Sequence, residues 1–111
     1  MMMENATNHV LDLDAARCPT ALIRTRQAIQ TFTVNSPTVG GLLLIQTIEP
    51  SLLRDVPFYL QHEHPELKLL EMHQAEISKD QLKTWQADDD VDDEDISDIS
   101  SQYMFVIARI A

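Results

Sequence analysis

The residue of this sequence with the greatest capacity for chemistry is its single cysteine, Cys18. It follows an apolar segment by a short loop and is followed directly by Pro19. Proline favours the first position of a helix, so we expect Cys18 to be a helix N-cap residue. The free N–H groups and the dipole at such an end stabilise a thiolate and lower the pKa of a thiol. Arg17 and Arg24 add positive charge nearby. These features alone do not separate a reactive cysteine from a buried structural one, because a free cysteine is often part of the core.

Periodic apolar residues predict the elements that would position this cysteine. Strands are expected at 10–14, 42–45, 67–73 and 103–110, and helices at 19–32 and about 50–62. The wholly apolar run 42–45 is typical of a strand in the interior of a sheet. Pro57 fits the second helix if Asp55 is its N-cap and Pro57 lies in the first turn.

The order strand, helix, strand, helix, strand, strand predicts a two-layer α/β sandwich. We expect a four-stranded mixed sheet in βαβαββ order with both helices on one face. The 111 residues allow one domain, over 9–111, preceded by a flexible N-terminus at 1–8. Cys18 would then lie at the carboxyl end of the first strand, where open α/β sheets usually place their sites.

Most of the negative charge lies in one segment, at about 76–102. Ten carboxylates against two lysines give this segment a formal charge of −8, and the rest of the chain carries −2 of the total of −10. The block 88–95 has one apolar residue, so we expect a solvated, mobile loop. It contains no glycine, which argues against a calcium loop. Ser78 and Gln81 form a capping box, with Ile77 and Leu82 as a staple, which predicts a short helix at about 79–86. Leu82 and Trp85 of this helix are then placed to pack on the body of the domain.

Two segments resemble a known family. Leu-Asp-x-x-Ala-x-Arg-Cys-Pro at 11–19 resembles the Leu-Asp-x-x-Gly-x-x-Cys-Pro-x-Pro signature of the TusA/SirA-like sulfur-carrier proteins. Glu-Pro-x-x-x-x-Asp-Val-Pro at 49–57 is similar to the segment that opens the second helix of that family. The resemblance covers residues 9–75 and the last strand. It implies the same βαβαββ fold, and it implies that Cys18 carries a persulfide.

The chain departs from the family pattern at three places. Ala21 replaces the second proline of the cysteine motif, and Ala15 replaces the glycine before it. The acidic insert is the third departure. The thiolate-stabilising end of the helix does not depend on the second proline, so we expect its loss to affect rigidity more than thiol chemistry.

From the resemblance we expect a cytoplasmic sulfur carrier of the sulfurtransferase type, with Cys18 cycling between thiolate and persulfide. Arg17, Pro19 and Arg24 would stabilise the thiolate or guide docking. The partners would be a protein sulfur donor, such as a cysteine desulfurase, and a protein acceptor. The protein itself would be a monomer or weak dimer. The alternative is a non-catalytic interaction or regulatory module of the same fold that binds through its acidic insert.

Composition excludes several other classes of function. A net charge of −10 repels phosphate backbones, so direct nucleic-acid binding is not expected. No apolar run is long enough to cross a bilayer, and the N-terminus lacks the basic and apolar regions of a secretory signal. His62, His64 and His73 lack the ligand spacing of a zinc site, so we expect surface histidines and no metal. No phosphate-binding glycine loop exists, and no cofactor is expected.

Overall fold

A computed structural model describes residues 8–35 and 40–110 of the chain. Its elements are β1 (Asn8–Asp12), α1 (Thr20–Asn35), β2 (Leu42–Thr47), α2 (Leu52–Glu63), β3 (Leu67–Glu76), α3 (Lys79–Ala87), α4 (Asp93–Ile96) and β4 (Ser101–Arg109). The predicted flexible segment 1–8 lies outside the described residues, except for Asn8, which begins β1.

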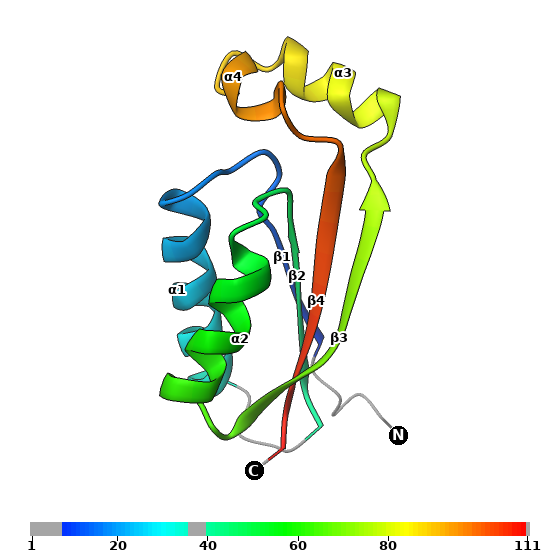
Figure 1. Ribbon diagram of the computed structural model, residues 1–111. Coiled ribbons are helices and arrows are strands. Elements are labelled where there is room, and N and C mark those ends of the chain that lie inside the picture. The colour runs from blue at the N-terminus through cyan, green and yellow to red at the C-terminus, as the bar shows by residue number, and fades with distance from the viewer. Residues whose placement is uncertain (1–7, 36–39, 111) are drawn as a thin grey trace.

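The four strands form one mixed sheet in the order β1-β2-β4-β3. β1 and β2 run parallel, and β4 pairs antiparallel with both β2 and β3. Figure 1 shows α1 and α2 together on one face of this sheet. The predicted two-layer α/β sandwich is therefore confirmed, with the apolar strand β2 in the sheet interior as expected.

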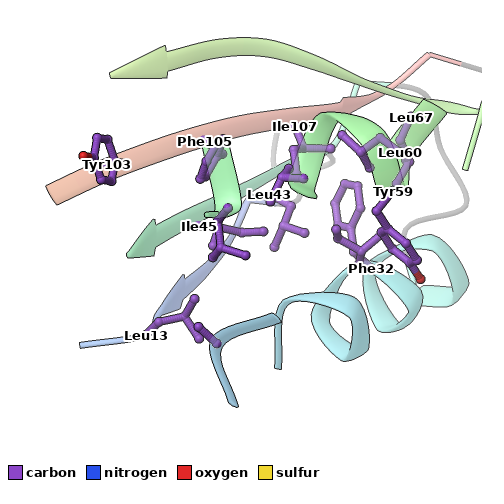
Figure 2. Close-up of a cluster of buried hydrophobic side chains, with 14 residues drawn as sticks. Leu13, Phe32, Leu43, Ile45, Tyr59, Leu60, Leu67, Tyr103, Phe105 and Ile107 are labelled. Atoms are coloured by element: carbon purple, nitrogen blue, oxygen red, sulfur yellow. The ribbon is translucent and has the colours of Figure 1, made fainter. Parts of the chain in front are cut away.

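The core lies between the sheet and the two long helices (Figure 2). Every second residue of β4 points into it, and Phe105 and Ile107 lie opposite Ile45 and Leu43 of β2 in the register of the sheet. Phe32 of α1 covers the same cluster. All five side chains are at most 2% exposed, so burial of this alternating apolar face fixes the register.

The second helix begins earlier than a cap at Asp55 would allow. α2 begins at Leu52 with Ser51 at the N-cap position, Asp55 lies in its first turn, and Pro57 lies inside the helix. The alternative in which Asp55 is the N-cap is therefore wrong. Proline donates no N–H, so the helix has one main-chain hydrogen bond fewer at this point, and burial of its apolar side compensates.

The acidic insert contains more regular structure than its composition predicts. Ser78 caps α3 as expected, because its Oγ accepts a hydrogen bond of 3.1 Å from the backbone N–H of Gln81. The acid block is solvated as predicted, but its second half forms the short helix α4. Figure 1 places α3 and α4 beyond the ends of β3 and β4, next to the loop between β1 and α1.

A second apolar cluster attaches the insert to the body of the domain. Trp85 and Ile96, each 5% exposed, pack with Ile77 from the end of β3 and with two residues of the body, Ala15 and Ile48. Leu82, Val91 and Ile99 border this cluster. The predicted helix thus packs on the body through Trp85 and Leu82, and Ile96 of α4 joins the same cluster, which the expectation of a loop at 88–95 did not include.

Candidate functional site

Cys18 lies in the loop between β1 and α1, at the carboxyl ends of the parallel strands β1 and β2. Its side chain is exposed and its thiol is free. This is the edge of the sheet at which the sequence places a site. The buried structural cysteine that the sequence left open is therefore ruled out.

The first turn of α1 differs slightly from the prediction. The helix begins at Thr20, one residue later than expected, so Cys18 precedes the N-cap position instead of occupying it. The Cys18–Pro19 peptide bond is cis. The carbonyl groups of Arg17 and Pro19 accept hydrogen bonds from the N–H groups of Ala21, at 2.9 Å, and Ile23, at 3.0 Å. The helix thus starts directly behind the thiol, as the cysteine–proline pair suggests.

The backbone of Cys18 is held by a residue of the other loop at this edge, Glu49. This carboxylate is 7% exposed and lies two residues after the end of β2. Its Oε1 accepts hydrogen bonds from the Cys18 N–H at 3.1 Å and from Arg17 Nε at 2.8 Å. Its Oε2 accepts one from the Ser51 N–H at 3.0 Å. One buried carboxylate therefore joins the loop before α1 to the loop before α2.

Glu49 is ionised across the physiological range. Burial raises the pKa of this carboxyl, but the hydrogen bonds donated by Arg17, Ser51 and Cys18 outweigh burial and lower its pKa to about 2. A buried carboxylate with this many donors is a fixed charge and a structural anchor. It is not a general base at neutral pH, because a group with so low a pKa holds a proton poorly.

Arg17 is directed at carboxylates and at the insert. Besides Glu49, its guanidinium donates to the main-chain oxygen of Asp95 at 2.6 Å and lies 3.4 Å from Oδ1 of Asp98. The sequence predicts that Arg17 stabilises a thiolate or guides docking. The structure gives its charge a different set of partners, and through them Arg17 joins the cysteine loop to α4.

Cys18 opens into a hollow of about 420 Å³ between the cysteine loop, α1 and the insert. Arg24 of α1 lines this hollow, as do the carboxylates of Asp14, Asp90 and Asp95. Burial raises the pKa of Asp14, Asp12 adds to the effect, and Arg24 opposes it. The predicted pair of Arg24 and Cys18 is thus brought to one hollow, together with carboxylates from the insert.

A hydroxyl lies against the thiol. Ser51 Oγ is 3.2 Å from Cys18 Sγ, within hydrogen-bonding distance for sulfur. Ser51 occupies the N-cap position of α2, yet its side chain makes no capping hydrogen bond. Its hydroxyl is thus available to the thiol.

The three histidines considered as metal ligands make local contacts. His64 lies 3.1 Å from the Tyr59 hydroxyl and 3.1 Å from Glu66, and His73 lies 2.7 Å from Glu71. The ring of His62 packs on Phe58. Within residues 8–35 and 40–110, no group of three His, Cys, Asp or Glu residues is placed to hold a metal ion.

Over the same part of the chain, no helix has the length and apolar character needed to cross a membrane.

Sequence reasoning missed two residues of this site, Glu49 and Ser51. Both belong to the segment 49–57 that resembles the opening of the second helix, and this resemblance is the signal that could have drawn attention to them. Their relation to Cys18 depends on the parallel pairing of β1 and β2, which brings the two loops to one edge.

Comparisons of the chain with protein-family models, with curated proteins and with solved structures gave no match.

Proposed function

We propose that this protein is a sulfur carrier that accepts and passes on a persulfide through Cys18. The observation that carries the proposal is the placement of an exposed thiol in an open hollow at the carboxyl ends of two parallel strands. Such edges are where α/β sheets usually build their sites. The resemblance of 11–19 and 49–57 to the TusA/SirA-like proteins supports the same activity.

The chemistry needs a thiolate and a donor that holds sulfane sulfur. The Cys18 thiolate attacks the outer sulfur of a donor persulfide, a new S–S bond forms at Cys18, and the S–S bond of the donor breaks. The donor cysteine leaves as a thiolate. Transfer to an acceptor repeats this exchange, with Cys18 as the leaving group. Each step forms one S–S bond and breaks another, so no further oxidant or reductant is needed.

The exposed position of Cys18 suits exchange with the cysteines of partner proteins. A protein donor, such as a cysteine desulfurase, and a protein acceptor would present their own cysteines at the hollow. We place this exchange in the cytoplasm, where protein thiols are kept reduced. Direct contact with nucleic acid is not part of the proposal, since the net charge of −10 opposes it.

The test is the intact mass of the reduced protein after incubation with a sulfane-sulfur donor. We expect the gain of one sulfur atom, removed by reductant and absent from Cys18→Ser. An unmodified Cys18 in a folded wild-type protein would contradict the proposal.

A second candidate is an interaction module that binds a basic protein surface through its insert. The observation in its favour is that the acid block stays exposed although the insert itself is packed on the domain. Asp88, Asp89, Asp92 and Asp93 can be changed together to Asn, which keeps the side-chain oxygens that accept from the backbone. If the protein is such an interaction module, we expect the variant with four Asn residues to lose partner binding and Cys18→Ser to retain it.

A further inference from the structure

We propose that Ser51 is a second catalytic residue of the Cys18 site, and that Glu49 is the positioning residue that holds Ser51 and Cys18 together. This inference rests on the proposed sulfur-carrier function. It assigns to Ser51 the stabilisation of the Cys18 thiolate when that thiolate leaves a persulfide.

The distance between the two side chains supports a hydrogen bond whose direction depends on the state of the thiol. Ser51 Oγ lies 3.2 Å from Cys18 Sγ, and either atom is able to donate. A thiolate has no proton, so in that state the serine hydroxyl must be the donor. Hydrogen bonds to charged groups are stronger than those between neutral groups.

Glu49 holds the backbones of Cys18 and Ser51 in this arrangement. Its two carboxylate oxygens accept from the N–H of Cys18 and from the N–H of Ser51, so one rigid group fixes the backbones of both residues. The Glu49 N–H in turn donates to Thr47 Oγ1 at 3.0 Å. Arg17 balances the charge of the carboxylate, which keeps it ionised and in place.

The hydroxyl proton of Ser51 has two acceptors. The Ser51 side chain also contributes to the low pKa of Glu49, so it lies within reach of that carboxylate. With a neutral thiol, Cys18 is able to donate to Ser51, and the serine proton is then available to Glu49. With a thiolate, the proton turns to sulfur. When the charge on Cys18 changes, rotation of the Ser51 hydroxyl is therefore enough to rearrange the hydrogen bonds, and the backbone does not need to move.

This assignment predicts unequal effects on the two halves of the sulfur cycle. In loading, a hydrogen bond raises the thiolate fraction but lowers the nucleophilicity of that thiolate, and these effects partly cancel. In discharge, Cys18 is the leaving group, and the hydrogen bond assists it without a compensating loss. A variant without the hydroxyl should therefore discharge slowly while it loads at nearly the normal rate.

The experiment uses inorganic polysulfide to load the full-length protein and cyanide to discharge it. Cyanide attacks the outer sulfur, thiocyanate forms, the S–S bond breaks, and Cys18 departs as a thiolate. We expect Ser51→Ala to slow thiocyanate release about tenfold, the effect of one charge-assisted hydrogen bond. Ser51→Thr keeps a hydroxyl and should restore the rate to within about twofold.

Glu49→Gln tests the positioning role. It should slow discharge in the wild-type background and add little in the Ser51→Ala background, because both changes act through one hydrogen bond. Glu66→Gln is the matched control, since Glu66 is another paired carboxylate, beside His64 at the opposite end of the sheet. Its discharge rate should equal that of the wild type. Circular dichroism checks the fold of each variant, and Ser51→Ala removes no helix cap.

Three results would overturn the assignment: normal discharge in Ser51→Ala, slow discharge in Ser51→Thr, or equal slowing of loading and discharge. If the wild type takes up no sulfur, the carrier function fails, and Ser51 is tested separately. The S-methylthio adduct of Cys18 is then released with dithiothreitol and followed by intact mass. Slower release from Ser51→Ala than from Ser51→Thr supports the role of the hydroxyl, and equal release refutes it.

Discussion

Arg17 and Glu49 form an ion pair of 2.8 Å between Nε and Oε1 across 32 positions of the chain. The pair is mostly shielded from solvent, with 23% of the Arg17 side chain and 9% of the Glu49 side chain exposed. It connects the cysteine loop, the loop before α2 and, through the carbonyl oxygen of Asp95, the acidic insert. The stability of the domain and the geometry of its thiol therefore depend on the same contact.

The first prediction concerns the pH dependence of stability. The pKa of Glu49 falls from 4.5 to about 2 on folding, so its ionised form contributes about 3 kcal/mol that is fully present above pH 4.5. This contribution is lost as the pH falls towards 2. We expect Glu49→Gln to lower the free energy of unfolding at pH 7, and the difference from wild type to shrink between pH 4.5 and pH 2.

Urea unfolding at several pH values measures this difference. Glu63→Gln is the control, because Glu63 is an exposed carboxylate at the far end of α2, and its stability should follow that of the wild type. A gap between Glu49→Gln and wild type that stays constant down to pH 2 would argue against ionisation of Glu49 as its cause.

The second prediction concerns the packing of the insert. Trp85 is the only tryptophan of the chain, and it packs against Ile48 and Ala15 of the body. We expect Trp85→Ala to destabilise the protein by about 3 kcal/mol, as the removal of a large buried aromatic side chain usually does. In the wild type, tryptophan fluorescence and circular dichroism should give the same urea midpoint, because the insert shares its cluster with the body. An earlier fluorescence midpoint would mean that the insert unfolds by itself.

The third prediction concerns the missing proline of the cysteine motif. Ala21 is fully buried, and its N–H donates to the Arg17 carbonyl at 2.9 Å. Proline has no N–H, and its ring must fit a closed site, so we expect Ala21→Pro to cost about 1–3 kcal/mol. Thermal and urea unfolding measure the cost. Equal or higher stability would show that this helix start accepts the family's second proline.

The order of elements and the two layers were predictable because they depend on local periodicity. The alternation of Tyr103, Phe105 and Ile107 identifies a strand with one buried face, and the run from Leu42 identifies an interior strand. The ends of elements were less predictable. β3 continues to Glu76 mostly with exposed residues, held by pairing with β4, and exposed side chains leave no apolar pattern.

The order of the insert was predictable for α3 and its Trp85, but not for the residues that complete its packing. Its apolar residues are few, and Trp85 and Ile96 become a core only together with Ala15 and Ile48, which are distant in the sequence. Ala15 stands where the resembled family has glycine, and its methyl group belongs to this cluster. Ala15 and the acidic insert both depart from the family pattern, and Ala15 thus helps to pack the insert on the domain.

The site was predictable in part. Cys18 was found because a cysteine before proline at a helix start is a recognisable local pattern. Glu49 and Ser51 act through contacts made by the tertiary fold, and a lone glutamate after a strand has no distinctive local pattern. For the same reason the contacts of Arg17 with Glu49, Asp95 and Asp98 were not foreseen, and its role toward the thiol stays a prediction.

The last prediction concerns the charge of reagents that reach Cys18. Asp14, Asp90 and Asp95 line the hollow with Cys18. Of the two arginines in this lining, Arg17 is paired with Glu49, so the three carboxylates face only Arg24 as an opposing charge. Carboxylates this close to a reacting thiol attract cations and repel anions, more so at low salt. A trimethylammonium-ethyl methanethiosulfonate should therefore modify Cys18 faster than the sulfonato-ethyl reagent. The rate ratio should exceed that of a small free thiol by about fivefold at low ionic strength.

Asp90→Asn/Asp95→Asn should bring this ratio close to that of the free thiol. The hydrogen bonds of these two residues at the site use backbone atoms, so the variant keeps them. Glu63→Gln/Glu71→Gln changes the net charge equally at exposed positions that do not line the hollow and should keep the wild-type ratio. Equal ratios in both variants would assign the effect to net charge. A ratio that falls in the first variant alone would assign the effect to the carboxylates that line the hollow.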